Sequence, residues 1–232
     1  YPGGGPYPTI FEMTRYWRRR GDEIPYTIRR AMQRGFVYVA MDERGTGASF
    51  GQWDRPLSAR ALQDTDEVLD WIVEQGWSNG RVGATGISYP GMAAQQIASR
   101  YHPGLRAIVP MSDSYDLYRD LIFPGGVFNE QFLQGWSEAV MALDRSTSLA
   151  IDGQSMVLRP VDEDSTGVLL EEAVAGHAGN LNPYETFEGI TFRDDPGLTG
   201  VTLDELSTER FWERIGESGI AVYHWGSWMD GG

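Results

Sequence analysis

The sequence predicts an α/β protein with a mostly parallel β-sheet that is covered by helices on both faces. Short apolar segments rich in β-branched residues alternate with segments of helical periodicity, and glycine-rich turns separate them. The alternation stops near residue 117 and resumes near residue 219. We therefore expect a core made of residues 1–116 and 216–232, interrupted by an inserted helical domain over residues 117–215.

The first two strands are expected to flank a helix. Residues 9–14 are expected to form one strand, and the continuously apolar residues 36–41 a second, buried parallel strand. Residues 22–34 are expected to form the helix between them, with Asp22 as its N-cap and Gly35 after its last turn.

The same alternation continues to about residue 110. Residues 61–75 place apolar side chains on one helical face, and a turn at 78–80 is expected to follow. A strand over 81–85, a helix over 92–100 and a strand over 105–110 come next. In the insertion, helices are expected over residues 130–143 and 167–175, and a buried strand over 219–225 resumes the core.

The turn between residues 86 and 91, Gly-Ile-Ser-Tyr-Pro-Gly, carries the strongest chemical signal. A serine on a tight strand-to-helix turn is typical of the nucleophile elbow of α/β-hydrolases. Such a turn lifts the Ser88 hydroxyl clear of the sheet and places it beside the free amides of a helix N-terminus. Pro90 occupies the position of the usual second glycine, and Gly91 follows one residue later. The alternative is an ordinary strand-to-helix turn.

A serine nucleophile also needs a base, an acid and donors to an oxyanion. Asp230 follows the predicted strand 219–225 across a short loop and could be the acid, or only a turn residue. The Tyr89 backbone amide and the Tyr16 hydroxyl could serve as donors, although Tyr16 could equally be a surface tyrosine. In the small-residue loop 42–51 we expect Arg44 to pair with an acid; the loop lacks the spacing of a phosphate loop.

Composition excludes several classes of function. The formal net charge is −14, and all 19 basic residues are arginines. Most of the imbalance lies in residues 144–232, which hold 5 arginines and 17 acids. Such a surface repels phosphate backbones, so we expect no nucleic-acid partner. It is either a solvated face or an acidic lid that attracts cationic substrates. The lack of lysine fits adaptation to high salt or a GC-rich genome.

No cofactor or metal is expected, because the chain has no cysteine and only three scattered histidines. No apolar segment reaches the roughly 18 residues of a membrane span, so we expect no membrane partner. A cytoplasmic location is slightly favoured over secretion, and the oligomeric state is undetermined from the sequence.

Several motifs together resemble the X-prolyl dipeptidyl-peptidase/cocaine esterase family. The motifs are Thr14–Arg18, Asp42–Gly51, Gly86–Gly91, Asp116–Asp120, Pro124–Asn129 and Gly226–Gly231. The resemblance implies an α/β-hydrolase core with a helical cap. It implies Ser88 as nucleophile, Asp230 as the acid of a catalytic triad, and the Tyr16 hydroxyl beside the Tyr89 amide as oxyanion donors. The family's G-x-S-Y-x-G elbow also accounts for the displaced glycine.

The chain departs from that family in two respects. The family's triad histidine follows the aspartate, so we expect it beyond Gly232, and the family's C-terminal jelly-roll domain is absent from the chain. We therefore expect a fragment cut at both ends. His102, His177 and His224 are expected to be structural.

The sequence thus favours a serine hydrolase that acts on a small ester, an amide or a short peptide through an acyl-enzyme. An esterase or acylase is the first choice, and an X-Pro dipeptidyl-peptidase or α-amino-acid ester hydrolase is the alternative. The latter two need acids that bind a substrate ammonium group. Asp113, Asp116 and Asp120 are candidates for that role, unless they only cap turns. A non-catalytic α/β-hydrolase scaffold that binds a ligand or partner is the alternative from another class.

Overall fold

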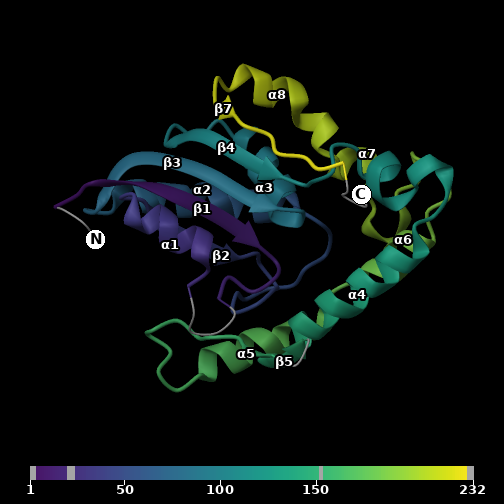
Figure 1. Ribbon diagram of the computed structural model, residues 1–232. Coiled ribbons are helices and arrows are strands. Elements are labelled where there is room, and N and C mark those ends of the chain that lie inside the picture. Colours follow the sequence, from purple (N-terminus) through teal and green to yellow (C-terminus); the bar gives the residue numbers. More distant parts are fainter. Residues whose placement is uncertain (1–3, 20–23, 152–153, 229–232) are drawn as a thin grey trace.

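The computed structural model describes residues 4–19, 24–151 and 154–228, and its centre is a parallel β-sheet (Figure 1). Within these residues the sheet has five strands in the order β2-β1-β3-β4-β7, and every neighbouring pair is parallel. The strands are β1 (Tyr7–Thr14), β2 (Val37–Asp42), β3 (Ser78–Ile87), β4 (Leu105–Met111) and β7 (Ala221–Val222). The predicted α/β class is confirmed.

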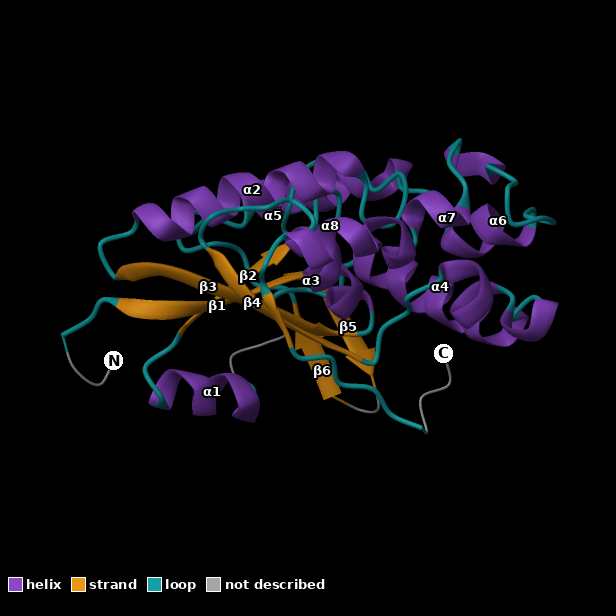
Figure 2. Ribbon diagram, turned by 90° about the horizontal axis from the view of Figure 1, so that it is seen from above, coloured by secondary structure: helices purple, strands orange, loops and turns teal. Residues whose placement is uncertain are grey.

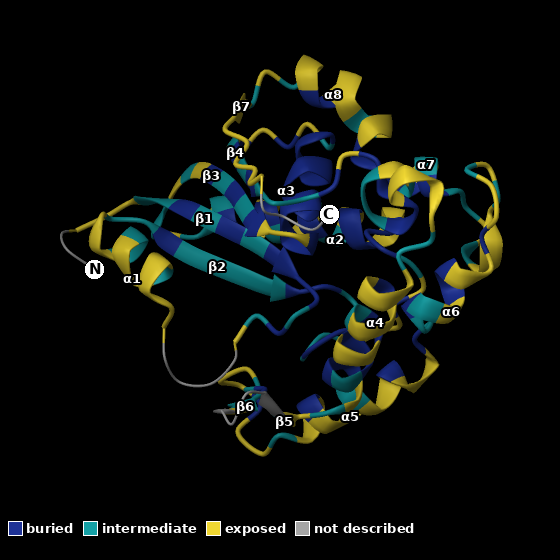
Figure 3. Cartoon of the chain, turned by 45° about the vertical axis from the view of Figure 1, so that its right-hand side comes forward, coloured by how far each residue is buried: buried dark blue, intermediate teal, exposed yellow. Residues whose placement is uncertain are grey.

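Helices cover both faces of this sheet, as parallel strands require. Helix α1 (Tyr26–Gln33) lies on one face, and α2 (Ala59–Glu74) and α3 (Tyr89–Ala98) lie on the other (Figure 2). All ten residues of α3 are buried, and Figure 3 shows this helix in dark blue. Its small side chains allow close packing against the sheet and so fix the position of the residue before it, Ser88.

Most of the segment after β4 leaves the sheet and forms a separate group of helices, but its last helix, α8 (Trp212–Glu217), returns to pack against α3. Helix α4 (Glu130–Arg145) runs beyond the carboxyl ends of the strands (Figure 1). A hairpin of β5 (Ser148–Ile151) and β6 (Gln154–Val157) follows. The remaining α-helices of the described residues are α5 (Val168–Gly176), α6 (Pro183–Glu188), α7 (Leu203–Leu206) and α8 (Trp212–Glu217), and a π-helix spans Leu117–Ile122. None of the described helices is both long and apolar enough to cross a membrane.

Two predicted elements in the first part of the core differ from the observed ones. The helix expected over 22–34 begins at Tyr26. Pro25 precedes it and disfavours helical backbone at Ile24, and Asp22 lies outside the described residues. Residues 78–80 are not a turn but the start of β3, where Tyr7 of β1 pairs with Ser78.

The strand expected over 219–225 was predicted to be buried, and this was wrong. Only Ala221–Val222 form β7, and both residues are exposed. Within the described residues this strand pairs with β4 alone, so it lies at an edge of the sheet. Trp225 adds an isolated bridge to Met111, the last residue of β4.

Candidate active site

The candidate site lies where the strand order of the sheet reverses. The chain passes from β1 outward to β2, and from β3 in the opposite direction to β4. Loops leaving β1 and β3 therefore diverge and leave a crevice at the carboxyl ends of these two strands, the usual ligand position in open α/β sheets. Tyr16 follows β1 and Ser88 follows β3. The topology thus brings together two residues that are 72 positions apart.

Ser88 occupies the tight turn that the sequence predicts. Its φ of 63° and ψ of −124° lie in a region that residues other than glycine rarely adopt. The turn is held because the Ser88 amide donates to the Met111 carbonyl at 2.9 Å, while the Ser88 carbonyl accepts from Gly91 at 2.8 Å and from Met92 at 3.0 Å. The side chain is exposed although all of α3 behind it is buried.

Two glycines make this turn possible. A Cβ atom on Gly86 would lie 2.3 Å from the Pro90 Cβ, and one on Gly91 would lie 2.9 Å from the Met111 carbonyl oxygen. Both distances are shorter than van der Waals contact. The glycine that comes one position late in the sequence is therefore required by the approach of α3 to the end of β4.

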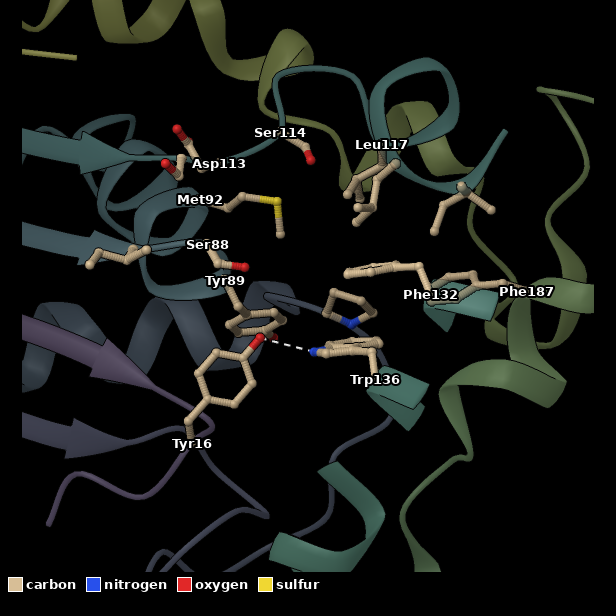
Figure 4. A pocket seen from close by; sticks show the side chains of 15 residues that line it. Tyr16, Ser88, Tyr89, Met92, Asp113, Ser114, Leu117, Phe132, Trp136 and Phe187 are labelled. Carbon is tan, nitrogen blue, oxygen red and sulfur yellow. Dashed lines mark hydrogen bonds between the residues drawn. The ribbon is translucent and has the colours of Figure 1, made fainter. Parts of the chain in front are cut away.

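The two tyrosines predicted to stabilise an oxyanion both lie beside Ser88. The Tyr16 and Tyr89 rings meet edge to face, with centroids 6.2 Å apart. The Tyr16 hydroxyl accepts a hydrogen bond of 2.9 Å from the Trp136 indole. Figure 4 shows the Ser88 and Tyr16 hydroxyls on the same side of a shared cavity. The Tyr89 amide is at the first position of α3, where amides have no partner within the helix.

The cavity in front of Ser88 has a volume of about 410 Å³ and two chemically different ends (Figure 4). At the sheet end, polar groups from the loops after β1, β3 and β4 line it. At the other end, the wall is apolar and comes from residues 117–187. The apolar wall is formed by Leu117, Leu121, Ile122, Phe132, Trp136 and Phe187. Such a cavity can hold a small ligand with an apolar group next to the serine.

Asp113 is the acidic residue of the cavity wall. Its carboxylate is fully buried, accepts a hydrogen bond from Gln95, and lies 2.8 Å from His224 Nε2. Burial raises the pKa of Asp113, and the contacts with Gln95 and His224 only partly oppose this. His224 therefore ties the segment after β7 to the loop after β4.

The other titratable candidates lie in structural contacts. Asp116 is buried, receives a 2.7 Å hydrogen bond from Arg193, and has a pKa lowered by the Arg119 amide and by Arg193 against the opposing effect of burial. Asp120 accepts from the backbone amides of Tyr115 and Asp116, as a capping residue does. Neither lines the cavity.

His102 contacts Asp70 at 3.1 Å, and His177 contacts the Ser49 and Asp144 carbonyls. Asp230, the predicted triad acid, lies outside the described residues. No three His, Asp or Glu side chains among the residues described gather in a way that could hold a metal ion. Arg44 pairs with Asp64, as the sequence predicts.

A buried polar network supports Tyr89 from behind. The Tyr89 hydroxyl accepts hydrogen bonds from the Leu57 amide at 3.0 Å and the Trp53 indole at 3.3 Å. It donates to Glu43 at 2.6 Å. Because both lone-pair directions of the phenol are taken, its proton is directed to Glu43. Burial raises the pKa of Glu43 to about 7, against the opposing effects of the Tyr89 hydrogen bond and the Arg15 charge.

Arg15 links this network to helix α4. Its guanidinium forms a 3.0 Å ion pair with Asp144, and both side chains are fully buried. The same guanidinium lies 4.2 Å from the centre of the Trp53 ring. Sequence reasoning missed Arg15, Glu43, Trp136 and Asp144. For three of them a weak signal existed, because Arg15 adjoins Tyr16, Glu43 comes two residues after the predicted strand 36–41, and Trp136 lies on the predicted helix 130–143. Asp144 comes one residue after that predicted helix.

We expect Glu43→Gln to change how stability depends on pH. A carboxyl whose pKa is about 7 in the folded state and about 4.5 in the unfolded state favours folding most when protonated. Its contribution is complete below pH 4.5 and is lost as the pH rises through 7. By linkage the loss is about 3 kcal/mol.

The measurement is denaturant unfolding of both proteins between pH 4.5 and 8, followed by tryptophan fluorescence. The difference in unfolding free energy, wild type minus variant, should fall across this range. Two curves that stay parallel would contradict the assignment.

The sheet order, the strained serine turn and the cavity together define an α/β-hydrolase. Comparison with known proteins agrees, because residues 1–231 match the X-Pro dipeptidyl-peptidase (S15) family. This chain belongs to that family.

Relatives named for different activities share this similarity. A candidate serine esterase of Mycobacterium bovis is 31% identical over 97% of this chain and 42% of its own length. The cocaine esterase of a Rhodococcus species is 30% identical over 85% of this chain and 34% of its own length. A candidate Xaa-Pro dipeptidyl-peptidase of Bacillus cereus is 25% identical over 83% of this chain and 35% of its own length. The chain thus spans about two fifths or less of the length of these relatives.

Solved structures agree with the fold. A CocE/NonD family hydrolase from Staphylococcus aureus superposes with a TM-score of 0.54 at 26% identity, over 61% of this chain and 28% of its own. An aminopeptidase from a marine sediment archaeon, Thaumarchaeota archaeon, superposes with a TM-score of 0.52 at 26% identity, over 59% of this chain and 26% of its own.

Proposed function

We propose that this chain carries the reactive serine and oxyanion hole of a serine hydrolase that cleaves ester or amide bonds. The observation that carries the proposal is the position of Ser88. Its exposed side chain follows a strained turn at the sheet end of an open cavity, with the Tyr16 hydroxyl beside it. Backbone strain of this kind is held in place by the surrounding structure and clusters at active sites.

In the proposed reaction the Ser88 oxygen attacks the substrate carbonyl carbon and forms a tetrahedral intermediate. Its proton passes to a histidine, which we place beyond Gly232 in the chain and which Asp230 orients. The Tyr89 amide and the Tyr16 hydroxyl donate to the oxyanion. The histidine then returns the proton to the departing alcohol or amine, which leaves the acyl-enzyme. Water next attacks the acyl carbonyl and gives its proton to the histidine, and the Ser88 oxygen departs with that proton and releases the acid.

The cavity supports an apolar acyl group as the preferred substrate feature. The wall opposite Ser88 consists of aliphatic and aromatic side chains. Contact between this wall and an apolar acyl group removes apolar surface from water and so favours binding. The contacts of Asp116 and Asp120 described above leave neither of them facing the cavity to bind a substrate ammonium. Asp113 does line the cavity, but its carboxylate is buried and already held by Gln95 and His224. This favours an esterase or acylase over an X-Pro dipeptidyl-peptidase or α-amino-acid ester hydrolase. We propose residues 117–215 as the cap that supplies this wall.

Two measurements on the full-length protein test the proposal. A fluorophosphonate probe is expected to label Ser88, as mapped by peptide mass spectrometry. In a panel of p-nitrophenyl esters and Gly-Pro-p-nitroanilide, we expect the esters to be hydrolysed, and faster than the anilide. Cleavage of the anilide alone would reverse the substrate preference. Absence of both labelling and turnover would favour a non-catalytic scaffold.

A further inference from the structure

One helix of the proposed cap contacts the side chains of both proposed oxyanion donors. Trp136 of α4 donates its indole N–H to the Tyr16 hydroxyl at 2.9 Å. The ring of the same residue stacks on Tyr89, with centroids 6.5 Å apart and planes inclined by 28°. Figure 4 shows the indole facing Tyr16 across the floor of the cavity. The part of the fold that lines the acyl side therefore also touches one proposed donor group, the Tyr16 hydroxyl, and the ring of the residue that supplies the other, Tyr89.

The direction of the Trp136–Tyr16 hydrogen bond is fixed by chemistry. An indole nitrogen is only a donor, so the phenol oxygen must accept. The Tyr16 O–H bond therefore cannot point toward the indole. A hydroxyl that accepts a hydrogen bond is also polarised and becomes a better donor. Both effects favour donation by Tyr16 to a negative oxygen near Ser88.

Helix α4 is held in place by a second contact two turns further on. Asp144 lies eight residues after Trp136, so both project from the same side of the helix. Asp144 forms the buried ion pair with Arg15, the residue before Tyr16. The Arg15 guanidinium also lies 5.4 Å from the centre of the Trp136 ring. The position of the indole relative to Tyr16 is thus fixed by packing on both sides.

We propose that Trp136 is a positioning residue for Tyr16, so that the oxyanion hole is complete only when α4 is docked against the core. This inference rests on the proposed serine hydrolase function. In it, Trp136 does not touch the oxyanion. It holds the phenol oxygen in place and directs the Tyr16 proton away from itself.

A double-mutant cycle in the full-length protein tests this proposal. The variants are Trp136→Phe, which keeps an aromatic ring but removes the N–H, Tyr16→Phe, and both together. Loss of one oxyanion donor costs about 10²–10³ in kcat, which we expect for Tyr16→Phe. For Trp136→Phe we expect a loss of about 10-fold in kcat with KM for p-nitrophenyl acetate little changed, as for loss of one hydrogen bond. The double variant should match Tyr16→Phe alone.

Additive losses in kcat would overturn the proposal, since Trp136 would then act independently of the Tyr16 hydroxyl. So would a change confined to KM, which would mean that the indole only contacts substrate. The second-order rate of fluorophosphonate labelling gives the same cycle without turnover. Labelling of Ser88 in the wild type together with an additive cycle would refute only the role of Trp136. An unlabelled Ser88 in the wild type would refute the proposed function as well.

Two further variants serve as controls. Trp71→Phe makes the same substitution on α2, at a residue that is half exposed and does not line the cavity, and should leave kcat and KM unchanged. Phe132→Leu alters the same cavity wall from α4 without removing a polar hydrogen. Its effect on acyl-chain preference should be equal in the wild-type and Tyr16→Phe backgrounds. Thermal unfolding midpoints of all variants check that each is folded.

Discussion

Replacing Ser88 by alanine should reduce kcat/KM of the full-length protein for p-nitrophenyl esters by about 10⁵-fold or more. The substitution removes the atom that would form the acyl-enzyme, while the Tyr16 hydroxyl and the Tyr89 amide remain. Serine hydrolases that lose their nucleophile keep only the small acceleration that binding and the oxyanion hole supply. Steady-state kinetics of the purified wild-type protein and variant measure this loss. Fluorophosphonate labelling should disappear in the variant as well.

Ser78→Ala provides a matched control for that experiment. Ser78 begins the same strand, β3, that Ser88 follows, but it lies at the opposite edge of the sheet. Its hydroxyl accepts a local hydrogen bond from the Gly80 backbone amide at 3.1 Å. Turnover by this variant should remain near the wild-type level. Ester hydrolysis that survives in Ser88→Ala at a comparable level would exclude Ser88 as the nucleophile.

Much of the core could be predicted because its strands are parallel and buried on both faces. A continuous apolar run after Gly35 located β2, a mainly apolar run after Gly104 located β4, and helical periodicity located α2, each within two residues of the observed bounds. The edge strand β7 was misjudged for the same reason. An apolar run implies a buried strand only if something covers it, and coverage is not a local property of the sequence.

The candidate site divides in the same way between local and distant signals. Ser88 was predicted because the elbow needs glycines at fixed positions near it, and these are visible within six residues. Tyr16 followed from the end of a predicted strand. The supporting contacts join residues more than 100 positions apart, such as Tyr16 with Trp136 and Arg15 with Asp144. No spacing rule connects such residues until the cap is folded against the core.

Removing the charge of Asp144 should strongly destabilise the protein. Asp144 accepts hydrogen bonds from the Arg15 guanidinium at 3.0 Å and from the side-chain amide of Asn180 at 2.7 Å. The side chains of Asp144 and Arg15 have no exposed surface. Asp144→Ala leaves the Arg15 guanidinium buried without this partner. Breaking one side of a buried ion pair costs about 3–5 kcal/mol of unfolding free energy. Denaturant unfolding followed by tryptophan fluorescence would measure this loss.

The double variant Arg15→Met/Asp144→Leu separates the uncompensated charge from the loss of packing. Because both charges are then absent, most of the stability lost in Asp144→Ala should return. Asp54→Ala is the control: this residue pairs with Arg55 at 3.0 Å, but its side chain is 55% exposed. Solvent-exposed pairs contribute at most about 1 kcal/mol. If Asp144→Ala cost no more than Asp54→Ala, the Arg15–Asp144 pair could not be what holds α4 against the core. The proposed dependence of the oxyanion hole on α4 would then rest on the Trp136–Tyr16 hydrogen bond alone.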